Sequence, residues 1–98
     1  MNNELREIKN KIFSKKDYLL KTYGVEKIGI FGSFARNEAT NKSDLDVLIT
    51  LKEPISYFKF FDLEKEIELL VGKKIDLATN EAIKSTIRPN VMKDLIFI

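Results

Sequence analysis

A chain of 98 residues is too short to fill two hydrophobic cores, so we expect a single domain over residues 1–98. Its composition, with 44% hydrophobic and 33% charged side chains, is that of an ordinary globular protein. The formal net charge of +2 is too small to indicate a nucleic-acid or membrane surface as the partner. Cysteine and histidine are both absent, which excludes thiol chemistry, disulfides and imidazole bases, so any bound metal must have oxygen ligands.

The N-terminal segment predicts a helix and no targeting signal. MNNELREIKNKIF carries charges from its start and has no apolar run long enough for a signal peptide or a membrane span, so a cytoplasmic location without membrane contact is expected. Apolar side chains then recur at helical spacing over residues 3–23, and Gly24 supplies a stop signal. The residues of this stripe are Leu5, Ile8, Ile12, Leu19 and Tyr23.

Two strands with a polar loop between them follow. VEKIGIF, residues 25–31, is short, β-branched and bounded by glycine, which predicts a strand leading into Gly32 and Ser33. Residues 34–36 are expected to begin a brief helix. After the loop NEATNKS, the segment DLDVLITL, residues 44–51, alternates in the manner of a strand.

The second half predicts a long helix, a strand and short helices. Residues 55–72 carry a helical apolar face closed by Gly72, and KKIDLAT forms a short strand containing Asp76. The remaining residues, 80–98, are expected to form one or two short helices interrupted near Pro89. The order α-β-α-β-α-β-α predicts an α/β (α+β) unit of two or three layers with a small mixed sheet.

Two aspartates at the start of the second strand indicate a cation site. Asp44 and Asp46 are two residues apart, so their carboxylates project from the same face and repel each other unless a cation lies between them. Mg²⁺ prefers such hard oxygen ligands and completes its shell with water and substrate phosphates. The alternative is that both carboxylates are solvated at a strand entrance, with Ser43 and Asp44 forming a turn.

Gly32, Ser33 and Asp76 could complete that site. Glycine and serine between a strand and a helix present backbone N–H groups to an anion, although an ordinary serine N-cap is the commoner explanation for the pair taken alone. Asp76 joins the other carboxylates if its strand lies beside theirs, and there it could bind a second metal or accept a proton from a hydroxyl. Otherwise it faces solvent near a strand end.

Together these residues match a family pattern. The glycine-serine pair, a ten-residue spacer containing an arginine, the paired aspartates and a later aspartate resemble the nucleotidyltransferases of the DNA polymerase β superfamily. The nearest likeness is to the minimal nucleotidyltransferase (MNT) group, the MNT antitoxins of HEPN/MNT toxin–antitoxin pairs. One departure is Asn37, where many relatives have glycine. The matching residues are Gly32, Ser33, Arg36, Ser43, Asp44, Asp46 and Asp76.

The resemblance implies a protein adenylyltransferase that transfers AMP from ATP to a tyrosine hydroxyl of a HEPN toxin and thereby silences it. The three aspartates would be the catalytic residues and the ligands of a two-metal Mg²⁺ site. The nucleotide-binding residues would be Gly32, Ser33, Arg36 and Ser43, with Ser43 in a turn that orients Asp44. Arg36 would touch the phosphates or form an ion pair with a carboxylate.

The small size leaves no second wall for a substrate site, so a HEPN partner or a second copy of the chain is expected to complete it. Phe58, Phe61 and the tail 95–98 are candidates for that contact or are plain core. Competing functions are a non-catalytic antitoxin acting by direct binding, and nucleotidyl transfer to a nucleic acid or a small molecule. Scattered lysines without an aromatic platform disfavour nucleic acid. The acceptor, the nucleotide preference and the oligomeric state are not encoded in any motif.

Overall fold

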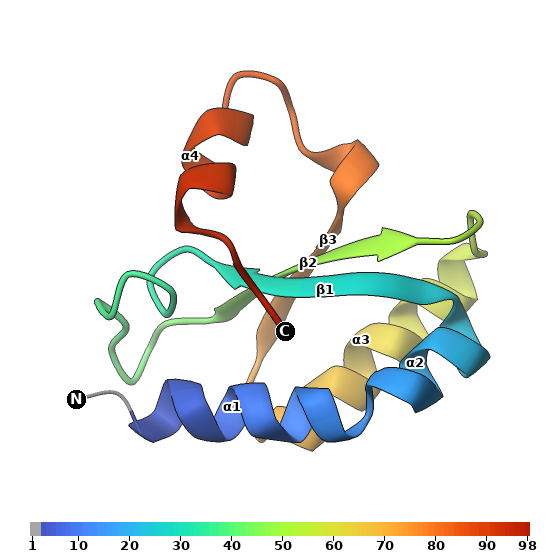
Figure 1. Cartoon of the computed structure of the whole chain (residues 1–98), viewed down its shortest axis with the longest axis horizontal. Coiled ribbons are helices and arrows are strands. Elements are labelled where there is room, and N and C mark those ends of the chain that lie inside the picture. Colours follow the sequence, from blue (N-terminus) through green and yellow to red (C-terminus); the bar gives the residue numbers. More distant parts are fainter. Residues whose placement is uncertain (1–2) are drawn as a thin grey trace.

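The computed structural model describes residues 3–98, which form one sheet with helices on both of its faces (Figure 1). No helix in this range is long and apolar enough to span a bilayer. The elements in chain order are α1 (Asn3–Ser14), α2 (Lys16–Tyr23), β1 (Val25–Phe31), β2 (Leu45–Leu51), α3 (Tyr57–Val71), β3 (Ile75–Thr79), the 3₁₀ turn η1 (Asn80–Ala82), α4 (Arg88–Asp94) and β4 (Ile96–Phe97).

The sheet is mixed, as the sequence predicts, and its strand order is β3-β2-β1-β4. β1 pairs antiparallel with both β2 and β4, whereas β2 and β3 are parallel neighbours. A parallel pair needs a crossover connection, and α3 provides it. β4 was not predicted, because a strand of two residues is too short to show alternation.

The hydrophobic core lies between the sheet and the three helices α1, α2 and α3, which cover the lower face in Figure 1. β2 explains how the core forms: Leu45, Val47 and Ile49 are buried on that face, as their alternation predicts. They pack with buried residues of the two long helical segments and β1, which are Ile8, Ile12, Leu19, Tyr23, Ile28, Ile30, Leu63, Ile67 and Val71.

The prediction of a single helix over residues 3–23 is wrong, because the helix is interrupted at Lys15 and two helices form. The backbone of Lys15 is non-helical, with φ −110° and ψ 7°, and its N–H bonds to the Ile12 carbonyl three residues back at 3.0 Å. The Ser14 hydroxyl also donates to the Lys11 carbonyl at 2.6 Å, a local bond that competes with helix continuation. Leu19 remains in the core after the break, so the apolar stripe stays in phase.

The opposite face of the sheet carries α4 and the C-terminal tail (Figure 1). Leu48 and Val91 are buried there, outside the main core. The tail passes so close to β1 that a Cβ on Gly29 would lie 2.7 Å from Leu95 Cδ1. β4 then pairs with β1, and the Ile98 N–H donates to the Ile28 carbonyl at 2.9 Å. Residues 95–98 are therefore largely packed on the sheet, and Phe97 is the exposed member at 60%.

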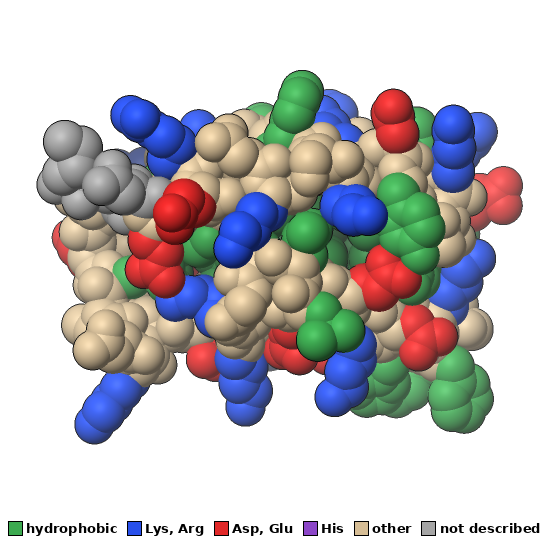
Figure 2. Space-filling model, turned by 90° about the horizontal axis from the view of Figure 1, so that it is seen from below, with side chains coloured by type: hydrophobic (Ala, Val, Ile, Leu, Met, Phe, Trp, Pro, Cys, Tyr) green, Lys and Arg blue, Asp and Glu red, His purple; other side chains and the backbone are tan. Residues whose placement is uncertain are grey.

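The face formed by the helical layer carries acidic and basic side chains interspersed with one another (Figure 2). Binding to a nucleic-acid backbone calls for basic side chains clustered on one face. This face shows no such segregation of charge, in agreement with the small net charge.

Candidate active site

Gly32 ends β1 in a conformation and a space that only glycine fits. Its φ is +75°, in the left-handed region, and a Cβ built on it would overlap the Asp46 carboxylate oxygen Oδ2. The carboxylate of β2 therefore lies directly against the backbone at the start of the turn. This close approach brings together two parts of the sequence motif.

Residues 32–37 form turns, so the brief helix expected over residues 34–36 is wrong. The Arg36 N–H donates to the Gly32 carbonyl at 3.1 Å, but Asn37 then takes a φ of 62° and ends the helical run. Asparagine is among the few residues other than glycine that adopt this conformation readily, so Asn37 can occupy the left-handed position in the turn. Phe34 is fully buried below the turn, with the Lys73 ammonium 4.4 Å from its ring centre.

Asp46 and Asp76 are neighbours because β2 and β3 are adjacent and in register. Asp46 lies opposite Phe31 on one side and Asp76 on the other. Neighbouring strands are about 4.8 Å apart, and paired residues project from the same face, so Asp46 and Asp76 are direct neighbours on the face away from the core. Asp44 comes one residue before β2 and, by the alternation of the strand, belongs to the same face.

The carboxylate of Asp46 interacts electrostatically with each of the other two aspartates. Partial burial raises its pKa above the ordinary value, and the negative charges of Asp76 and Asp44 raise it further. The positive charge of Arg36 acts in the opposite direction. Asp46 is therefore a partly buried carboxylate with two like charges beside it, an arrangement that a cation would stabilise.

The donor set fits Mg²⁺, although the side chains are not gathered around a single point. Within residues 3–98 no three acidic side chains are close enough together to hold a metal. Asp44 and Asp76 are exposed, and within this range neither has a side-chain hydrogen bond or an ion pair, so both can rotate without moving the strands. Three carboxylates beside a glycine turn supply the hard oxygen ligands that Mg²⁺ takes in proteins.

Arg36 and Ser43 both lie in the loop between β1 and β2. Arg36 forms ion pairs with Glu38 at 3.0 Å and with Asp94 of α4 at 2.7 Å, so the ion-pair alternative of the sequence analysis is present. The Ser43 N–H donates to the Thr40 carbonyl at 3.0 Å, and its hydroxyl accepts from the Thr40 N–H at 2.9 Å. Ser43 therefore closes a turn immediately before Asp44.

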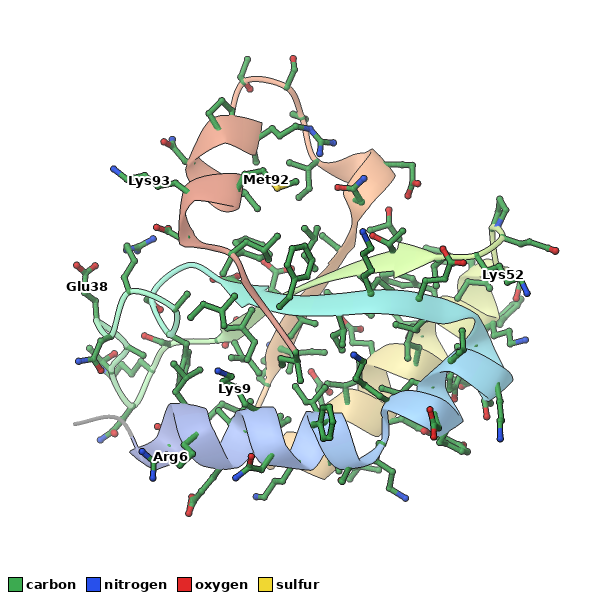
Figure 3. All side chains as sticks on the ribbon, in the orientation of Figure 1. Arg6, Lys9, Glu38, Lys52, Met92 and Lys93 are labelled. Atoms are coloured by element: carbon green, nitrogen blue, oxygen red, sulfur yellow. The ribbon has the colours of Figure 1, made fainter. Side chains whose placement is uncertain are left out.

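The side-chain view shows which end of the sheet carries this site. Glu38, in the loop, and Lys93, on α4, lie at the same end of the molecule, whereas Lys52, after β2, lies at the other (Figure 3).

An apolar groove of about 650 Å³, which was not predicted, opens at the end of the molecule that carries Lys52. Phe58 and Phe61, for which contact with a partner and plain core were the two alternatives, are exposed at 82% and 45%.

The comparison with protein families identifies the chain. The model described as "Nucleotidyltransferase domain" matches residues 6–98, nearly all of the described chain. The chain therefore belongs to the nucleotidyltransferase domain family, and the resemblance read from the motif is confirmed. The site just described, a glycine-serine turn against carboxylates of adjacent strands, is the part of the fold that carried that resemblance.

Two curated relatives cover almost the whole chain. MJ0128 of Methanocaldococcus jannaschii, provisionally named a protein adenylyltransferase, is 43% identical over 95 residues, covering 96% of this chain and 97% of the relative. Protein adenylyltransferase MntA of Thermococcus cleftensis is 36% identical over 94 residues, with 96% and 95% covered.

Solved structures show the same fold. A protein provisionally named a minimal nucleotidyltransferase superposes with a TM-score of 0.79 at 25% identity, covering 94% of this chain and 93% of the other. The structure of a tri-AMPylated Shewanella oneidensis HEPN toxin in complex with its MNT antitoxin matches with a TM-score of 0.67 at 12% identity, covering 92% and 70%. At that identity the second match speaks for the fold alone.

Proposed function

We propose that this chain is a magnesium-dependent protein adenylyltransferase that transfers AMP from ATP to a tyrosine hydroxyl of a HEPN-family toxin, and so acts as an antitoxin in the cytoplasm. The observation that carries the proposal is the pairing of Asp46 with Asp76 beside the Gly32 turn. It is supported by relatives named protein adenylyltransferases that share more than a third of the sequence over nearly the whole chain.

The residues of the turn would bind the nucleotide. The Gly32 and Ser33 N–H groups would donate to the phosphates of ATP, and Gly32, which has no Cβ, would allow the backbone to approach them closely. Asp44, Asp46 and Asp76 would hold Mg²⁺, which when bound neutralises charge on the triphosphate and on the departing pyrophosphate.

Asp76 is the best placed of the three to act on the acceptor. It lies on β3, an edge strand of the sheet, and its side chain is exposed. Its carboxylate accepts the proton of the tyrosine hydroxyl as that oxygen attacks the α-phosphorus. A bond forms between the tyrosine oxygen and the α-phosphorus while the bond from the α-phosphorus to pyrophosphate breaks, so the products are AMP-tyrosine and pyrophosphate.

The test uses the purified chain, the protein encoded beside it, Mg²⁺ and ATP labelled at the α-phosphate. The wild type should label the neighbour, and Asp46→Asn should abolish the label because it removes a central charge from the site. Asp62→Asn is the matched control, since it removes one exposed carboxylate from α3. If Asp46→Asn abolishes labelling but still neutralises the toxin fully in cells, the antitoxin acts by direct binding and the proposal is wrong.

A further inference from the structure

An ion pair ties the loop after β1 to the C-terminal helix. Arg36 Nη1 donates to Asp94 Oδ2 at 2.7 Å, and Arg36 Nε donates to Glu38 Oε1 at 3.0 Å. Glu38 lies in the same loop, two residues away, whereas Asp94 is 58 residues distant in sequence and ends α4. The guanidinium is therefore held from two sides, and one of these contacts comes from a different part of the fold.

The two carboxylates differ in how firmly they are placed. The Glu38 side chain is 65% exposed on a loop, whereas the Asp94 side chain is 17% exposed. α4 is fixed on the sheet by the buried Val91 and by β4, in which Ile96 pairs with Ile30 of β1. Asp94 therefore anchors Arg36 to the rigid body of the domain, and Glu38 adds a local contact of the weak, solvent-screened kind.

The anchored guanidinium keeps one edge open, and its residue belongs to the Gly32 turn. Within residues 3–98 the second terminal nitrogen, Nη2, has no hydrogen-bond partner. The backbone places this arginine at the site, because the Arg36 N–H donates to the carbonyl of Gly32 at 3.1 Å and Gly32 lies directly against the Asp46 carboxylate. A guanidinium with open N–H groups recognises phosphate oxygens, and fixing its long side chain beforehand reduces the entropy lost on binding.

We propose that Asp94 is a positioning residue for the nucleotide: it holds Arg36 so that the open edge of the guanidinium faces the triphosphate of ATP at the Gly32 turn. The C-terminal segment 88–98 would thereby contribute to nucleotide binding. This inference rests on the proposed function, because it requires a triphosphate beside Gly32.

A double-mutant cycle tests the coupling between Asp94 and Arg36. The dissociation constant of a non-hydrolysable ATP analogue with Mg²⁺ is measured by calorimetry for the wild type, Asp94→Asn, Arg36→Ala and the double variant. Each single change should weaken binding by about threefold to tenfold, and the double variant should bind no more weakly than Arg36→Ala, because Asp94 acts only through that arginine. Asp94→Glu should restore affinity, and Asp62→Asn should leave it unchanged.

The outcomes separate this inference from the function beneath it. If Asp94→Asn binds the analogue as tightly as the wild type, or if the two losses multiply in the double variant, Asp94 is not a positioning residue, although the proposed function stands. Multiplying losses would mean that Asp94 acts on the fold independently of Arg36, and thermal unfolding of each variant would show it. If the wild type itself does not bind the analogue, the proposed function is wrong and this inference fails with it.

Discussion

Replacing Gly32 by alanine should separate the strain of its backbone from its contact with Asp46. Gly32 and Gly72 both have φ +75°, so alanine at either position costs about 1–2 kcal/mol of left-handed strain. At Gly72 a Cβ meets nothing within 4 Å, whereas at Gly32 it overlaps Asp46 Oδ2 and also lies 3.0 Å from Asp46 Cγ. Rotation of the carboxylate relieves the first contact but not the second, so Gly32→Ala should lose about 1 kcal/mol more.

Thermal unfolding and nucleotide binding together read out the two effects. For a domain of this size, each kcal/mol of lost stability lowers the midpoint of thermal unfolding by about 4–8 °C. Both variants should therefore unfold at a lower temperature than the wild type, and Gly32→Ala should have the lower midpoint of the two. Only Gly32→Ala should also weaken the binding of Mg²⁺ and ATP analogue, by about tenfold or more, because its Cβ would displace Asp46, a proposed metal ligand, and would block the approach of the phosphates. Equal losses of affinity in the two variants, or wild-type affinity in Gly32→Ala, would refute the role assigned to this turn.

Two further predictions concern the carboxylates. Asp46→Asn should stabilise the folded chain at neutral pH even though it should remove activity, because the ionised carboxylate is partly buried beside two like charges. Because the pKa of Asp46 is raised in the folded chain, its carboxyl group stabilises the fold only when protonated: this contribution is complete below the ordinary pKa of 3.8 and is lost as the pH rises through the pKa of the folded state. The stability advantage of Asp46→Asn should therefore vanish in acid. A thermal-melt series in which the difference between variant and wild type is the same at all pH values would argue against this. Removing Mg²⁺ with a chelator should stop labelling of the partner while leaving the circular dichroism spectrum intact, and labelling that persists without divalent cations would contradict the assignment of the three aspartates as metal ligands.

The sequence predicted the faces of the strands better than the contacts between distant segments. Alternation along residues 44–51 is a local property of the sequence. It correctly predicted that Val47 projects from the buried face of the sheet and Asp46 from the opposite face. The adjacency of Asp76 followed only from the register of β2 with β3, which local pattern does not specify. An ion pair of Arg36 with a carboxylate was one alternative, but Asp94 could not be named as the partner, because it lies 58 positions away and belongs to no motif.

The errors in the helices also have local physical causes. The apolar stripe over residues 3–23 continues through Lys15 without a glycine or proline, so periodicity alone gives no sign of the break that the backbone shows there. The expected helix after Ser33 is ended by the left-handed backbone of Asn37. In both cases a single residue with a non-helical backbone conformation interrupts the helix, and the hydrophobic pattern does not reveal it.

The central claim is that the chain transfers the α-phosphoryl group of ATP, with its adenosine, to a protein hydroxyl. The most direct measurement incubates the chain with its partner and Mg²⁺ in two parallel reactions, one with ATP labelled at the α-phosphate and one with ATP labelled at the γ-phosphate. The account predicts stable label on a partner tyrosine from the first reaction and none from the second. Label from the γ-phosphate, or no label from either, would contradict it.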